Sequence, residues 1–154
     1  LGDLYKRQTY CDYDNNPTNS ETYGRLYNWY TVDDSRGLCP EGWHVPSDNE
    51  YTVLTDFLGD WEIAGGKMKE EGLEHWNSTN TGATNESGFT GLPAGYRQND
   101  TGTNTNMGYY GYFWSSSESN SWNAWYRYLS FNTSSVSRYD DYKQQGFSIR
   151  CLKD

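Results

Sequence analysis

The clearest hydrophobic pattern in the chain is a helical one that follows a capping sequence. In "VPSDNEYTVLTDFLG", Ser47 stands where a helix N-cap belongs and Glu50 follows three residues later, which makes a capping box. Apolar residues then recur at the spacing of one helix face: Tyr51, Leu54 and Leu58. Gly59 is a helix stop signal. The pattern predicts a helix over residues 47–58.

Alternating, aromatic-rich segments predict strands elsewhere. They lie at residues 22–32, 110–116, 123–131, 134–138 and 146–152. The segment "AGGKMKEEG" fits either a short second helix or a mobile turn, and the Asn/Thr/Gly/Ser-rich stretch 77–111 predicts a long loop. A helix followed by a loop-rich middle and late antiparallel hairpins is typical of an α+β domain.

The strand predicted at 123–131 separates two kinds of residue by period two. One phase holds Trp125, Arg127, Leu129 and Phe131, and the other holds Tyr126, Tyr128, Ser130 and Asn132. We interpret the first set as the core face, with Arg127 as its one misfit, and the second as an exposed aromatic-polar face. We expect the following segment 139–142 to form a loop beside that exposed face.

Composition indicates one folded domain with an aromatic core. The chain has 154 residues, few aliphatic side chains and a net charge of -9, a combination that taken alone is typical of disorder. Seven Trp and 15 Tyr change that picture, because each aromatic ring buries about 150–250 Å². A few large rings therefore suffice for a core.

Charge and surface composition restrict the partners and the location. A pI near 4.6 disfavours nucleic acid and anionic membranes, which both need a positive surface. No run approaches the roughly 18 apolar residues of a transmembrane helix, so we expect no direct membrane insertion. The Tyr/Ser/Asn/Gly-rich surface favours an extracellular, cell-surface or virion-surface location. The chain begins at Leu1 without a methionine, and we expect that an upstream segment was removed or lies outside this sequence.

The three cysteines, Cys11, Cys39 and Cys151, leave at least one thiol without an intramolecular partner. Cys39–Cys151 is the pairing we favour, and three reduced, mostly buried cysteines are the alternative. That bond closes a loop of about 112 residues, which the chain-entropy model values at roughly 4–5 kcal/mol.

The sequence contains few features that would support an enzyme active site or a metal site. No nucleophile elbow, phosphate loop or HExxH helix is present, and we predict no catalytic residue, no cofactor and no metal site. Packing or hydrogen bonding explains His44 and His75 better than catalysis does. Adjacent acids such as Asp140 and Asp141 point to opposite faces of a strand, whereas glycosidase carboxylates face each other. The segment 12–19 lacks the EF-hand glycine and glutamate and fits a turn.

Several segments occur in a familiar order: "YGRLYNWYTV", "GLCPEGWHVPSDNEYTVL", "AGGKMKE", "GFTGLPAGYR", "GYFWSSSE", "AWYRYLSF" and "GFSIRC". Over residues 10–152 the chain resembles the Fibrobacter succinogenes major paralogous domain family, found in bacterial surface and secreted proteins. The resemblance implies a C-type-lectin-like fold, kin to formylglycine-generating-enzyme-like domains. That fold has one helix on small antiparallel sheets and long ordered loops.

The resemblance also bears on the cysteines and on calcium. In lectin-like domains a cysteine near the first helix bonds one in the last strand, and Cys39 and Cys151 occupy those places. The chain departs from the calcium-binding lectins, because Trp122-Asn123-Ala124 lacks their aspartate and no acid-Pro-amide loop occurs. It also lacks the paired late cysteines with which formylglycine-generating enzymes hold copper.

The late part of the chain has the composition of a recognition surface. Tyr provides contact area at low entropic cost, and Ser and Asn provide adaptable hydrogen bonds. Related lectin-like domains are variable proteins of diversity-generating retroelements, which mutate adenines and so scatter an AAC codon among Asn, Tyr, Ser and Asp. The predicted exposed positions carry those residue types, whereas the residues interleaved with them mostly do not. Bacterial surface domains that are Asn/Ser/Tyr-rich throughout are the alternative.

We therefore expect a non-enzymatic ligand-binding or adhesion domain, the hypervariable display domain of a retroelement variable protein, with a protein or glycan on a cell surface as its partner. The predicted ligand-binding residues are Asn120, Trp122, Asn123, Tyr126, Tyr128, Ser130, Asn132, Ser137, Tyr139, Asp140 and Tyr142. Replacing Tyr126, Tyr128 and Tyr139 by alanine should abolish ligand binding and leave the melting temperature nearly unchanged. An invariant carbohydrate-binding or structural module and a degenerate formylglycine-type oxidase are the alternatives.

Overall fold

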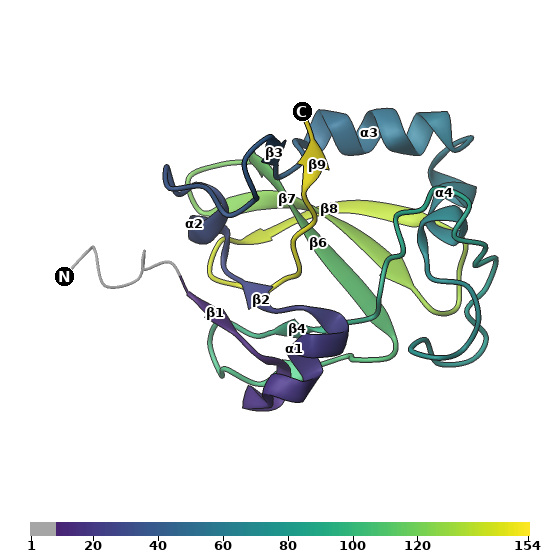
Figure 1. Ribbon diagram of the computed structural model, residues 1–154, viewed down its shortest axis with the longest axis horizontal. Helices are drawn as coiled ribbons and strands as arrows, with labels where there is room; N and C mark the ends of the chain where they lie inside the picture. Colours follow the sequence, from purple (N-terminus) through teal and green to yellow (C-terminus); the bar gives the residue numbers. More distant parts are fainter. Residues whose placement is uncertain (1–8) are drawn as a thin grey trace.

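The computed structural model describes residues 9–154 and has a mixed α+β architecture (Figure 1). Its helices are α1 (Pro17–Tyr23), α2 (Trp29–Val32), α3 (Asp48–Phe57) and α4 (Trp61–Met68), with a 3₁₀ turn η2 (Tyr13–Asn15) before α1. Its strands are β1 (Tyr10–Cys11), β2 (Leu26–Tyr27), β3 (Trp43–His44), β4 (Tyr96–Arg97), β5 (Asn104–Thr105), β6 (Tyr110–Glu118), β7 (Asn123–Ser130), β8 (Val136–Tyr142) and β9 (Leu152–Lys153).

A three-stranded antiparallel sheet organises the domain. Its strand order is β6-β7-β8, with Tyr112 opposite Tyr128 and Tyr126 opposite Tyr139. Two-stranded pairings, β1-β2, β3-β9 and β4-β5, surround it. The prediction of late antiparallel hairpins is confirmed. The expected loop over 139–142 is wrong, because these residues extend β8 to its end at Tyr142.

Each face of this sheet packs against its own hydrophobic cluster. On the helix side the cluster consists of Tyr51, Leu58, Ala64, Met68, Trp76, Phe113, Leu129 and Val136. On the other side it consists of Trp29, Tyr112, Trp114, Ala124, Tyr126 and Phe147. The central strand β7 is therefore covered on both faces, and large rings supply much of the core.

The helix predicted at 47–58 is confirmed as α3. Ser47 Oγ accepts a hydrogen bond from the Glu50 amide at 3.2 Å, and a Glu50 carboxylate oxygen accepts one from the Ser47 amide at 2.7 Å. The cap satisfies amides at the helix start that have no partner inside the helix. Of the two readings of "AGGKMKEEG", the short second helix is the one observed, as α4.

The two adjacent glycines of α4 permit close packing on the turns beside it. A Cβ atom on Gly65 would lie 2.0 Å from the carbonyl oxygen of Ser135, and one on Gly66 would lie 2.3 Å from that of Gly82. No other residue type fits in this space without moving backbone. Helix α4 thereby fixes the turn between β7 and β8.

Two of the strand predictions are wrong over most of their length. Residues 22–32 contain only β2 as a strand, because α1 runs to Tyr23 and α2 begins at Trp29. Residues 146–152 are an extended segment in which Phe147 bridges Tyr27 and Ser148 bridges Phe113, with β9 beginning only at Leu152.

The predicted Cys39–Cys151 disulfide is present, and Cys11 is the free cysteine. The disulfide ties the loop before β3 to the residue that precedes β9. Strand β3 pairs with β9 in the same region, so the end of the chain is held beside the start of α3. Figure 1 shows β9 next to that helix.

The long polar segment after α4 is anchored by one buried lysine. The ammonium of Lys69 donates to the carbonyl oxygens of Thr81 at 2.9 Å, Ser130 at 2.8 Å and Thr133 at 2.9 Å. Burial lowers the pKa of Lys69 to about 8. Three backbone carbonyls thus converge on one cation and hold the loop against the sheet.

Candidate functional site

Five tyrosine side chains lie side by side on one face of the central sheet. We call this set, Tyr110, Tyr112, Tyr126, Tyr128 and Tyr139, the tyrosine face. Strand register puts them on the same side, because residues directly opposite in an antiparallel pair share a face. Rings of Tyr110 and Tyr128 stack with centroids 5.2 Å apart, and those of Tyr126 and Tyr139 lie 6.4 Å apart. The rings therefore form a row across all three strands.

Burial divides the tyrosine face into an anchored part and an exposed part. Tyr112 and Tyr126 are each only 9% exposed, since Phe147 packs on their rings at 5.1 and 4.8 Å. Tyr110 and Tyr128 are half-buried, and Tyr139 on the edge strand is 57% exposed. A partner can contact the second group without disturbing the first.

Three phenol groups of this face, those of Tyr112, Tyr126 and Tyr128, are held in their neutral form by burial. Burial raises the pKa of Tyr112 and of Tyr126 far above the ordinary value, and raises the pKa of Tyr128 to about 12. A neutral phenol donates and accepts hydrogen bonds but is neither a base nor a nucleophile near neutral pH. What these residues offer to solvent is therefore ring area and neutral hydroxyl groups.

Two of the predicted ligand-binding residues are not accessible. Tyr126 belongs to the core cluster, and Ser130 is 3% exposed, with its hydroxyl donating to Asn132 Oδ1 at 2.7 Å. The expectation that this phase of β7 is exposed is wrong for both. The physical reason is that β7 is the central strand and is covered on both faces.

The remaining predicted residues separate into two surfaces. Tyr128, Ser137 and Tyr139 lie on the tyrosine face, and Asn132 is exposed in the turn at one end of β7. The others lie on the opposite face of the sheet or in the turn between β6 and β7: Asn120, Trp122, Asn123, Asp140 and Tyr142. The eleven-residue set is thus not one continuous patch.

The second surface has its own internal order. Asp140 accepts hydrogen bonds from Ser119 at 2.8 Å and from Asn123 at 3.0 Å, and the Asn123 and Ser119 bonds hold the pKa of Asp140 below its ordinary value. Beside this group, Trp122 is 67% exposed and Tyr142 is 55% exposed. Here the polar groups fix the turn and two aromatic rings stand in solvent.

Sequence reasoning missed two members of the tyrosine face and one neighbour. Tyr110 and Tyr112 share a phase in "YGYFW", and that alternation was a usable signal. What it lacked was the register that places them opposite Ser130 and Tyr128. Tyr109, 46% exposed, joins the row through the ring of Phe131 at 5.2 Å.

Arg127, the one charged residue of the predicted core face, is buried, and its charge is balanced by a carboxylate at the start of α3. Asp48 at the start of α3 accepts from Arg127 Nη1 at 2.6 Å and from Arg138 Nη2 at 2.8 Å. Burial alone would raise the pKa of Asp48, but the hydrogen bonds from Arg138 and Arg127 outweigh it and the pKa is lowered. Arg138 also lies 3.5 Å above the ring of Trp125. This network fixes β7 and β8 to the helix.

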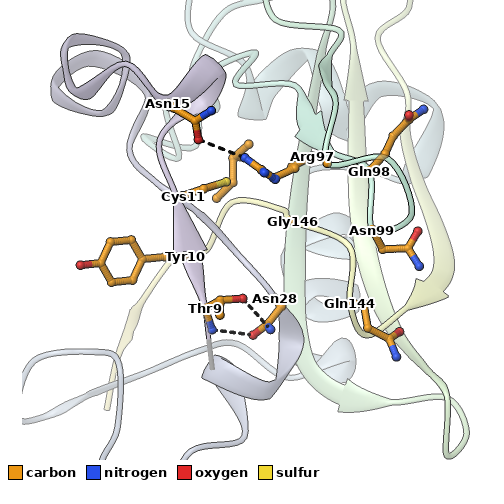
Figure 2. Close-up of a pocket in the computed structure, with 12 residues that line it drawn as sticks. Thr9, Tyr10, Cys11, Asn15, Asn28, Arg97, Gln98, Asn99, Gln144 and Gly146 are labelled. Atoms are coloured by element: carbon orange, nitrogen blue, oxygen red, sulfur yellow. Dashed lines mark hydrogen bonds between the residues drawn. The ribbon is translucent and has the colours of Figure 1, made fainter. Parts of the chain in front are cut away.

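A polar groove of about 490 Å³ lies between β1 and the segment before Phe147 (Figure 2). Arg97 crosses it and donates to Asn15 Oδ1 at 3.2 Å. The free thiol of Cys11 lines it, and burial raises the pKa of this thiol, which makes it a weak nucleophile. None of the predicted ligand-binding residues lines this groove.

The family comparison matches almost the entire chain. The Fibrobacter succinogenes major domain matches residues 3–153. The chain belongs to this family. The resemblance inferred from the ordered segments is therefore confirmed. No curated protein and no solved structure matches the chain. Within residues 9–154, none of the helices has the length and apolar character needed to cross a bilayer.

Proposed function

We propose that this family member is a non-enzymatic ligand-binding or adhesion domain that works at a cell or virion surface. The single observation that carries the proposal is the row of rings from Tyr110 to Tyr139, rigid at its core and exposed at its edge. Tyrosines packed against one another lose little entropy on binding, since their rings are already ordered. The partner we propose is a surface protein, because partly exposed tyrosine rings provide the contact area typical of protein-recognition surfaces.

We further propose that the fold is C-type-lectin-like and that the exposed positions are diversified by a retroelement. Supporting the first point, the Cys39–Cys151 bond and the pairing of β3 with β9 hold the chain end beside the start of α3. Supporting the second, Tyr128, Ser137 and Tyr139 are accessible and belong to the residue types that an AAC codon reaches. Buried Tyr126 and Ser130 are scaffold in this proposal and are not diversified.

The gene neighbourhood tests the diversification. We expect a reverse transcriptase gene and a template repeat nearly identical to the coding sequence for the late strands. Its mismatches should fall on adenines at codons for the accessible positions and spare the codons for Tyr126 and Ser130. A neighbourhood without the transcriptase and repeat would remove this part of the proposal and leave the binding domain as proposed.

A glycan is the second candidate ligand, because the second surface carries two exposed aromatic rings, Trp122 and Tyr142. Exposed aromatic rings stack on sugar faces. We propose that the domain has no enzymatic role: Cys151 is bonded to Cys39, which leaves Cys11 without the second thiol that a copper oxidase of the formylglycine-generating type uses.

An array experiment separates the candidates. The purified domain is applied to an array of extracellular proteins and to a glycan array, with a Trp122→Ala variant alongside. Protein binding that persists in the variant supports the proposal. Glycan binding that Trp122→Ala removes favours the second candidate, and a domain that binds neither class would contradict ligand binding as the function.

A further inference from the structure

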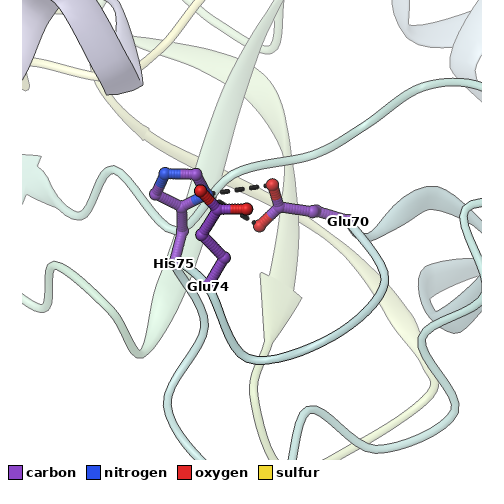
Figure 3. Close-up of side chains that lie close together, drawn as sticks. All are labelled: Glu70, Glu74 and His75. Atoms are coloured by element: carbon purple, nitrogen blue, oxygen red, sulfur yellow. Dashed lines mark hydrogen bonds and ion pairs between the residues drawn. The ribbon is translucent and has the colours of Figure 1, made fainter.

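Three side chains with metal-ligating atoms meet in the turn after α4, and none of them belongs to the tyrosine face. Glu70, Glu74 and His75 each place a ligand atom within 4.8 Å of the others (Figure 3). His75 Nδ1 lies 2.9 Å from both carboxylate oxygens of Glu70. The group thus combines one imidazole with two carboxylates.

The turn that carries these residues is held from outside. The side-chain amide of Asn80 donates to the carbonyl oxygens of Glu70 at 2.9 Å and Gly72 at 2.7 Å. The ring of His75 packs edge-on against Tyr23, with centroids 5.4 Å apart. Two of the three ligands are therefore positioned by the fold, and only Glu74 is exposed.

Charge and hydrogen bonding around the group are incomplete. Among residues 9–154, Glu70 has an ion pair only with His75, and Glu74 has none. Asn80 is 6% exposed, and its Oδ1 is buried without a hydrogen-bond partner in this part of the chain. Within residues 9–154 the two carboxylates have only the His75 ring as a possible cationic partner, and this charge balance favours the binding of a cation.

We propose that Glu70, Glu74 and His75 form a site for a divalent transition-metal ion of the Zn²⁺ class. A mixed set of imidazole and carboxylate ligands suits Zn²⁺, whereas Ca²⁺ and Mg²⁺ take oxygen ligands. Bonds of about 2.1 Å to the ion put neighbouring donors roughly 3.0–3.4 Å apart. The 2.9 Å contact between His75 and Glu70 is close to that spacing.

Binding then needs only small changes. The ion takes the place of the proton that His75 Nδ1 shares with Glu70, and this proton passes to solvent. The exposed Glu74 side chain rotates inward to complete the three protein ligands. The bound ion links the two ends of the 70–75 turn, so it stabilises the folded state by mass action.

The other histidine provides a matched control. His44 also contacts two carboxylates, with Nδ1 2.6 Å from Asp154 and Nε2 2.9 Å from Glu50. These carboxylates contact different ring nitrogens, on different sides of the imidazole. They do not converge on one ion, and His44 belongs to no candidate metal group among the described residues.

The test is calorimetric titration of the whole chain with ZnCl₂ near pH 7, in a Cys11→Ser background that removes the free thiol. We expect one ion per chain, a rise in Tm and no competition from CaCl₂. Glu74→Gln and His75→Ala should each weaken binding at least about tenfold, and His44→Ala should leave it unchanged. Without metal, Glu74→Gln should unfold at the wild-type Tm, because Glu74 is exposed and makes no ion pair within residues 9–154.

Several results would overturn the site. The first is the absence of saturable zinc binding. The second is zinc binding of wild-type affinity in each of the single variants Glu74→Gln and His75→Ala. The third is zinc binding that His44→Ala abolishes. None of these outcomes depends on whether the tyrosine face binds a ligand, so the metal site and the proposed function are tested independently.

Discussion

Replacing Tyr126 by alanine should destabilise the domain strongly, whereas the same change at Tyr139 should not. The two residues are directly opposite on β7 and β8, and both belong to the tyrosine face. Tyr126 is 9% exposed and contacts Phe147 with ring centroids 4.8 Å apart, while Tyr139 is 57% exposed. Exposure, and not chemistry, distinguishes them.

The magnitude follows from the cavity that each change leaves. Removing a buried aromatic ring costs about 3–5 kcal/mol, because transfer and cavity terms add. For Tyr139 more than half of the side chain is already in water, and we expect a loss of about 1 kcal/mol. In a domain of this size 1 kcal/mol shifts Tm by about 2–4 °C. Tyr126→Ala should therefore lower Tm by about 6–20 °C and Tyr139→Ala by about 2–4 °C.

Thermal unfolding followed by circular dichroism, with urea unfolding as a second measure, distinguishes the two cases. Tyr126→Phe is the control, since it keeps the ring in the cluster and should unfold near the wild-type Tm. A Tyr126→Ala variant that loses less than about 1 kcal/mol would show that its ring is not part of the core. The anchored half of the tyrosine face would then be assigned wrongly.

Three more predictions concern the scaffold. Asp48→Ala should cost about 3–5 kcal/mol in urea unfolding, because it leaves the buried Arg127 without its carboxylate, and a loss under 1 kcal/mol would contradict this role. Reduction of Cys39–Cys151, which spans 112 residues, should cost roughly 4–5 kcal/mol, and an unchanged Tm in reductant would refute it. Hydrogen bonds to Asp154 and Glu50 raise the pKa of His44. The stabilisation that protonated His44 provides is therefore full below its unfolded-state pKa and is lost as the pH rises through its folded-state pKa. An NMR titration that gives His44 an unshifted pKa would contradict this prediction.

Local signals with a clear mechanism predicted local structure well. Ser47 and Glu50 are three residues apart, and that spacing alone specified the capping box that the structure contains. The alternation along β7 also predicted correctly which residues share a face. The Cys39–Cys151 disulfide, the favoured pairing that the family resemblance then supported, is present.

The region before α3 could not be predicted in the same way. Its aromatic alternation resembles a strand, yet Asn16 caps α1 by accepting from the Thr18 amide at 3.1 Å, with Pro17 at the first helical position. This helix runs to Tyr23, so its cap prevails over β propensity only at residues 22 and 23 of the predicted strand. The extended strand that propensity favours is broken into short pieces.

The site was predicted only in part because burial is a property of the whole sheet. The period-two pattern gives two faces but does not say that both are covered, so Tyr126 and Ser130 were assigned to a surface. The split of Tyr139 and Tyr142 onto opposite faces depends on strand β8 continuing where a loop was expected. Register and strand order lie outside what one sequence shows.

The central claim is that recognition occurs on the tyrosine face, and Tyr139 and Tyr142 test it as a matched pair. Both lie on β8 and are similarly exposed, at 57% and 55%, but they point to opposite faces of the sheet. The measurement is the Kd of an array-identified ligand for wild type, Tyr139→Ala and Tyr142→Ala. We predict a Kd at least about tenfold higher for Tyr139→Ala and an unchanged Kd for Tyr142→Ala. Weakened binding in Tyr142→Ala with wild-type affinity in Tyr139→Ala would contradict the account and move the site to the opposite face.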